Sequence, residues 1–77
     1  MSRHTAELRR LTDSELVQAI DNAKEELFNL RFQWEQGQLD DYTRIRQLKK
    51  EVARLLTIQR ERELAAQIVQ EEEIHAE

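Results

Sequence analysis

Two stretches of the chain carry apolar residues at helical spacing, and a short polar segment separates them. In the first stretch, successive apolar positions are 4, 3, 4, 3 and 4 residues apart, so they form one stripe along a helix: Leu16, Ile20, Ala23, Leu27, Leu30 and Trp34. Thr12 and Glu15 have the spacing of a capping box, in which each side chain accepts from the other residue's backbone N–H. We therefore expect a long helix that begins at Asp13.

The second stretch has a shorter stripe, at steps of 3, 4 and 3 residues and flanked by Leu56: Ile45, Leu48, Val52 and Leu55. Asp41 is the expected N-cap of this helix, and Asp40 adds negative charge near the positive end of the helix dipole. The stripe weakens where Gln59 and Arg62 take the next positions. Residues 68–77 are then predicted to form a frayed acidic tail.

The segment between the two stretches contains Gly37, the only glycine of a chain that has no proline. Glycine enters positive φ at little cost, so it is favoured where a helix must stop. A connection of about four or five residues between helices of about 22 and 28 residues makes the two helices antiparallel. Thr5 is a candidate cap for a short helix that continues through Leu8 to Arg10.

The predicted fold class is therefore all-α, a long antiparallel two-helix hairpin with a short N-terminal helix. We expect the hairpin domain to span residues 1–64. Residues 65–77 are expected to form an acidic C-terminal extension, either a frayed helix or disordered.

Length and composition exclude several classes of function. A chain of 77 residues cannot enclose a deep pocket and supports only a marginal fold, so we expect a macromolecular partner and neither enzymatic activity nor a small-molecule substrate. His4 and His75 lie near opposite ends without ligand spacing, so no metal or other cofactor is expected. No apolar run approaches the roughly 20 residues of a membrane span, and no signal peptide is recognisable. The absence of cysteine fits a reducing compartment, and a cytoplasmic localisation is expected.

The formal net charge of −4 averages two unlike regions. Residues 44–62 contain seven bases and two acids, whereas residues 63–77 contain five acids and no base. The local field decides what docks, so the first region can bind a polyanion. The acidic run at residues 71–73 is either a solvated end or a segment that repels misplaced RNA or contacts a basic neighbour.

Five of the bases share one side of the second predicted helix. Three form a ridge at positions i, i+4 and i+8, and two lie between this ridge and the apolar stripe: Arg46, Lys50 and Arg54, then Lys49 and Arg60. The ridge of Arg46, Lys50 and Arg54, called the basic ridge below, has two readings. It is either a solubilising face or an edge that follows the phosphates of a nucleic acid.

The predicted turn is polar but uncharged at the positions around its glycine. Gln33, Gln36 and Gln38 surround Gly37, and a turn of this small profile can approach an RNA minor groove closely. The alternative is a turn that is merely soluble. Arg31, beside the first stripe, could reach either a phosphate or an acid across the hairpin.

Phe28 and Phe32 are four residues apart but lie off the first stripe, on a second helix face with Val17. One interpretation is that the N-terminal segment folds back and covers them with Leu8 and Leu11. The other is that they form an exposed aromatic pair that packs on a neighbouring protein or stacks with bases.

Four segments give a more specific indication: residues 26–33 (ELFNLRFQ), 37–39 (GQL), 44–46 (RIR) and 49–54 (KKEVAR). Together they closely resemble bacterial large-subunit ribosomal protein number twenty-nine, also called the uL29 family. The resemblance covers about residues 8–64, including the order of the helices and the position of the turn.

This resemblance implies a structural component of the large (50S) ribosomal subunit. Members bind large-subunit (23S) rRNA near the exit of the nascent-peptide tunnel, beside large-subunit protein number twenty-three, and nascent-chain factors could dock nearby. Carried over by position, the resemblance implies an RNA-facing set of Arg31, Gln33, Gln38, Arg44, Arg46, Lys49, Lys50 and Arg54. Phe28 and Phe32 are the candidates for contact with a protein partner.

A second hypothesis is kept beside this one. The chain could be a free coiled-coil hairpin that acts as a protein-interaction module through its seam and its phenylalanines. The two hypotheses differ in their response to salt, because phosphate contacts are screened by salt and apolar burial is little affected.

Overall fold

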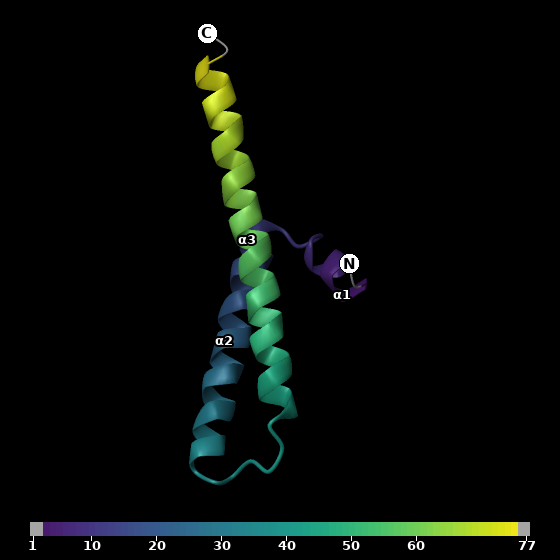
Figure 1. The fold of residues 1–77 in the computed structure, drawn as a ribbon, viewed down its shortest axis with the longest axis vertical. Coiled ribbons are helices and arrows are strands. Elements are labelled where there is room, and N and C mark those ends of the chain that lie inside the picture. The colour runs from purple at the N-terminus through teal and green to yellow at the C-terminus, as the bar shows by residue number, and fades with distance from the viewer. Residues whose placement is uncertain (1–2, 76–77) are drawn as a thin grey trace.

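The computed structural model describes the backbone of residues 3–75 and the side chains of residues 6–73. Three helices follow one another: α1 (Arg3–Leu8), α2 (Asp13–Glu35) and α3 (Thr43–His75). α2 and α3 lie side by side and antiparallel, α1 projects from the flank of the hairpin, and α3 continues well past the start of α2 (Figure 1). The molecule is a rod of 61 × 24 × 16 Å. The predicted all-α hairpin with a short N-terminal helix is confirmed.

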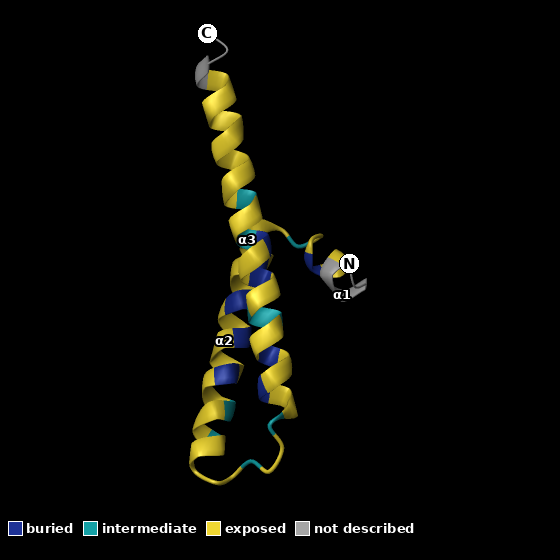
Figure 2. Ribbon diagram, in the orientation of Figure 1, coloured by how far each residue is buried: buried dark blue, intermediate teal, exposed yellow. Residues whose placement is uncertain are grey.

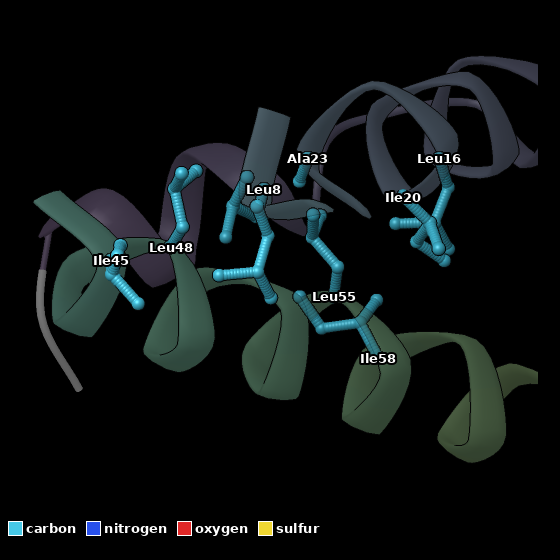
Figure 3. Close-up of a cluster of buried hydrophobic side chains, with 9 residues drawn as sticks. Leu8, Leu16, Ile20, Ala23, Ile45, Leu48, Leu55 and Ile58 are labelled. Atoms are coloured by element: carbon cyan, nitrogen blue, oxygen red, sulfur yellow. The ribbon is translucent and has the colours of Figure 1, made fainter. Parts of the chain in front are cut away.

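The core is a single apolar seam between α2 and α3, onto which Leu8 of α1 also packs (Figures 2 and 3). Its buried side chains are Leu8, Leu16, Ile20, Ala23, Leu27, Ile45, Leu48, Leu55 and Ile58. Most of these are the residues that the two stripes predicted, whereas Leu30 and Val52 are partly buried at the edge of the seam. The hydrophobic periodicity therefore identified the interface between the helices.

Two residues of the seam differ from the prediction. Ile58 is buried although the stripe was expected to end at Leu55, because it follows Leu55 by three residues on the same face of α3 and α2 still lies opposite this part of the helix. Trp34 was expected in the seam, but it is 44% exposed. α3 begins only at Thr43, so no helix lies opposite the last turn of α2.

The N-terminal segment closes the open end of the hairpin. α1 begins at Arg3, before Thr5, which corrects the predicted start of this helix. Arg62 of α3 donates hydrogen bonds to the carbonyl oxygens of Leu11 at 2.7 Å and Arg9 at 3.1 Å, and the Arg9 guanidinium pairs with Glu61 at 2.6 Å. These contacts hold the segment in place and bring Leu8 onto the core.

Phe28 and Phe32 are therefore not covered by the N-terminal segment. Leu8 is buried in the core and Leu11 packs against it, whereas Phe28 and Phe32 lie toward the turn and are 71% and 55% exposed. The interpretation in which this segment folds back over the phenylalanines is wrong, because the contacts of Arg62 tether the segment elsewhere.

The ends of α2 are formed by local hydrogen bonds. The expected capping box is present: the Glu15 amide donates to Thr12 Oγ1 at 3.1 Å, and the Thr12 amide donates to Glu15 Oε1 at 3.3 Å. At the other end Gly37 has φ +71°, and the amides of Gly37 and Gln38 donate to the carbonyls of Trp34 and Gln33. This is a Schellman motif, and it places the glycine where the sequence predicted it.

The connection between the helices, residues 36–42, is longer than the four or five residues expected. α3 begins at Thr43, so Tyr42 holds the N-cap position rather than Asp41. Asp41 still serves the helix start from one residue earlier, because its carboxylate accepts from the Thr43 amide at 2.9 Å and from the Thr43 hydroxyl at 2.6 Å. These bonds hold the pKa of Asp41 below its usual value.

α3 extends as a helix to His75, and its side chains from Glu63 to Glu73 are exposed (Figure 2). Both it and α2 exceed the predicted lengths, at 33 and 23 residues. α3 crosses residue 64 without a break. The proposed division of the chain into a hairpin domain and an acidic extension at this residue stays a prediction.

Replacing Gly37 with alanine should lower the free energy of unfolding by about 1–2 kcal/mol, the cost of holding a Cβ-bearing residue in the left-handed region. A Cβ at this position would meet no atom within 4 Å, so crowding adds nothing to the cost. Urea unfolding followed by circular dichroism measures the change. Gly37→Asn is the matched control and should lose less, since asparagine tolerates this conformation. Equal stability of the alanine variant and the parent chain would contradict the prediction.

Candidate nucleic-acid interface

The basic ridge lies on the outer face of α3. Arg46, Lys50 and Arg54 are exposed, and the buried Ile45 and Leu48 occupy the opposite side of the same helical turns. Because the core fixes the rotation of α3, the three cations are held in one row along the helix axis. At a rise of 1.5 Å per residue, neighbours in this row are about 6 Å apart, close to the spacing of phosphates along one nucleic-acid strand. The row can therefore contact several phosphates at once.

Arg44 lies on another flank of α3 and is occupied within the hairpin. Its Nε donates to Glu26 Oε1 at 2.9 Å and its Nη2 donates to Glu26 Oε2 at 3.0 Å. These hydrogen bonds raise the pKa of the Arg44 guanidinium. The pair is bidentate and links α3 to α2, so the structure does not bring Arg44 into the row formed by the basic ridge.

A cluster of cations and aromatic rings forms where the turn meets α3. Lys49 Nζ donates to the Tyr42 hydroxyl at 2.9 Å and lies 5.3 Å from the centre of the ring, and Arg46 Cζ lies 6.0 Å from the same centre. The Lys49 hydrogen bond and the positive charges of Lys49, Arg31 and Arg46 lower the pKa of the Tyr42 phenol. Three residues predicted to face RNA thus converge on one side of the hairpin.

Sequence reasoning missed Tyr42 and misplaced its neighbour Trp34. The two rings pack nearly perpendicular, with centroids 5.1 Å apart and planes at 69°. One signal was available: Trp34 is the last position of the first stripe and Tyr42 precedes the second stripe, so a turn between them brings their rings together. The role of Glu26 carried no such signal, because its partner Arg44 is far away in the sequence.

The glutamines of the turn lie beside this cluster. Gln33 is partly buried and Gln38 is exposed, and the Schellman motif joins them directly through the bond from the Gln38 amide to the Gln33 carbonyl at 2.9 Å. The backbone therefore holds both residues at the tip of the hairpin, where their amide side chains can meet a ligand.

Phe28 and Phe32 form a separate apolar surface on α2, together with Val17, which is 47% exposed. On the helix this surface lies on a different face from the seam. An exposed aromatic pair of this kind is typical of a protein-contact site.

Other kinds of site have little support in the described part of the chain. No group of three or more potential metal ligands occurs among residues 6–73, and the side chains of His4 and His75 fall outside that range. Within residues 3–75, none of the helices is both long and apolar enough to cross a membrane.

Comparison with known proteins gives a consistent result. The family model described as Ribosomal L29 protein matches residues 6–62. The large ribosomal subunit protein uL29 of Carboxydothermus hydrogenoformans is 55% identical over 64 residues, which cover 83% of this chain and 93% of that protein. Its counterpart from Geobacillus stearothermophilus is 60% identical over 60 residues, covering 78% and 91%. That from Streptomyces griseus is 49% identical over 65 residues, covering 84% and 88%.

Proposed function

We propose that this chain, which belongs to the ribosomal L29 protein family, binds 23S rRNA through α3 and the turn. As a member of this family it is a structural constituent of the large ribosomal subunit and not an enzyme. Family membership also gives its localisation, the cytoplasmic ribosome, as expected from the sequence. The observation that carries the proposal is the exposed row of Arg46, Lys50 and Arg54 on a helix whose rotation is fixed by the core.

The mechanism is scaffolding by charge neutralisation. Each arginine or lysine of the basic ridge replaces counterions on a phosphate, and the release of those ions favours binding. Arginine suits this role because its planar fork can hold two phosphate oxygens at once. Arg31 and Lys49 extend the positive field from the basic ridge to the turn, where Gln33 and Gln38 meet the sugar and base edges.

Arg44 has a more limited part in the proposed RNA-facing set. Its side chain is 50% exposed, and Glu26 occupies its Nε and Nη2. We assign to it a phosphate contact through Nη1 and a structural contact through the other two nitrogens.

The location in the subunit is also a proposal. We propose that the hairpin lies near the nascent-peptide exit tunnel, beside large-subunit protein number twenty-three, as the resemblance to the family implies. The exposure of Phe28 and Phe32, 71% and 55%, supports contact with an adjacent protein. These residues lie on α2, whereas the basic ridge lies on α3. Nascent-chain factors would dock nearby.

Replacing Arg54 with alanine should lower the slope of log K against log salt concentration by about one unit for binding to 23S rRNA. A filter-binding titration at several salt concentrations gives the slope. Arg10→Ala is the matched control, because Arg10 is exposed at the opposite end of the hairpin and should leave the slope unchanged. An unchanged slope for Arg54→Ala would remove this residue from the contact set.

The exposed phenylalanine pair favours a second candidate function, that of a free hairpin that acts as a protein-interaction module. Sucrose-gradient fractionation of a native extract separates the two candidates. Migration with the large subunit at low salt, with release only at high salt, supports an rRNA-bound component. A position at the top of every gradient would favour the free hairpin instead.

A further inference from the structure

An open aromatic surface lies at the tip of the hairpin. Trp34 continues the stripe of buried α2 residues, but α3 starts too late to cover it, so 44% of the residue is exposed. The ring of Tyr42 packs against the indole of Trp34, with the two ring planes at 69°. The exposed part of the indole is where another flat ring can stack.

The charges around these rings select the kind of ring that would bind. Lys49 and Arg46 lie 5.3 and 6.0 Å from the centre of the Tyr42 ring, and the charge of Arg31 acts on the same phenol. A heterocycle that carries phosphates on both sides matches an aromatic surface with cations around it. A neutral apolar side chain of a protein would leave these cations without a counterpart.

The acids of the turn offset part of this positive charge. Asp41 accepts from the amide and hydroxyl of Thr43, which keeps its carboxylate ionised, and its charge acts on Arg46. Glu35 and Asp40 are exposed. On α2, Glu35 follows Trp34 by one residue, about 100° around the helix, so its carboxylate projects from a different face.

We propose that the Trp34–Tyr42 pair is a stacking platform for one unpaired nucleobase of RNA, with Arg31, Arg46 and Lys49 contacting the phosphates on either side of that base. This inference rests on the proposed function and adds a base contact to the phosphate contacts of the basic ridge. Stacking is tolerant of sequence, because every base has a flat face, so the platform would recognise an unstacked nucleotide and not a particular base.

The test uses the full chain and two RNA probes of equal charge. One is an eight-nucleotide oligoadenylate, and the other is an eight-nucleotide oligomer of the same backbone with abasic residues. Trp34 is the one tryptophan of the chain, so its fluorescence reports stacking directly. We expect oligoadenylate to quench this emission and to bind about fivefold to a hundredfold more tightly than the abasic oligomer in fluorescence polarisation.

Two variants complete the design. Trp34→Leu should bind both probes with the affinity that the parent chain shows for the abasic oligomer, with an unchanged salt slope. Trp34→Phe should recover part of the preference for oligoadenylate, and circular dichroism checks that both variants are folded.

The outcomes separate this inference from the proposed function. Equal binding of both probes by the parent chain, with a normal salt slope and unquenched emission, overturns the platform but leaves the phosphate contacts in place. Failure of the parent chain to bind either probe or 23S rRNA overturns both.

Discussion

Replacing Ile45 with alanine should lower the free energy of unfolding by about 2–5 kcal/mol, the range for removing a large buried aliphatic side chain. Ile45 is completely buried in the first turns of α3, and Figure 3 shows it beside Leu48 at one end of the core cluster. Urea unfolding measures the loss. Leu56→Ala is the matched control, since Leu56 lies on the same helix but is 39% exposed, and it should cost far less.

The expected loss is large for this chain because its core is thin. The seam is one layer of side chains between two helices, and the described residues supply no second cluster that could hold the fold together. A loss of several kcal/mol is a large fraction of the stability of a small domain. The Ile45→Ala variant should therefore be largely unfolded when free, and RNA binding should recover part of its helicity. Equal stability of the Ile45→Ala and Leu56→Ala variants would contradict this account.

Replacing Arg62 with methionine should lower the free energy of unfolding by about 2 kcal/mol, the scale of hydrogen bonds that involve a charged group. Methionine keeps an unbranched apolar stem but removes the donors to the Leu11 and Arg9 carbonyls and to Asp13. Leu8 should then leave the core, because these bonds hold the segment that carries it.

Amide hydrogen exchange gives the most specific measure of this change. In Arg62→Met the amides of α1 should exchange almost as in a free peptide, while those in the middle of α2 stay protected. Arg60→Met is the matched control, because Arg60 is exposed on the same helix and should leave α1 protected. Identical exchange in the two variants would show that Arg62 does not anchor the N-terminal segment.

The features that the sequence predicted correctly are those determined by local periodicity and local hydrogen bonding. The stripe from Leu16 to Leu27, the capping box at Thr12 and the positive φ of Gly37 depend on residues a few positions apart. The row formed by Arg46, Lys50 and Arg54 follows from the same periodicity, because the core stripe fixes which way these residues point.

The errors have a common physical origin in contacts between distant segments. The exposure of Trp34 depends on the length of the connection to α3. The pairing of Arg44 with Glu26 depends on how the helices align across the seam. Periodicity within one helix contains no information about any of these contacts.

The ion pairs at the two ends of the hairpin have a consequence for register. The buried part of the described core is entirely apolar, and its side chains repeat at similar intervals on both helices. A shift of α3 along α2 by one repeat would still bring apolar residues together, so such a core discriminates weakly between alignments. The pairs Arg44–Glu26 and Arg62–Asp13 would both be broken by that shift. Exposed pairs contribute little to stability, but these two make one alignment of the helices preferable to its neighbours.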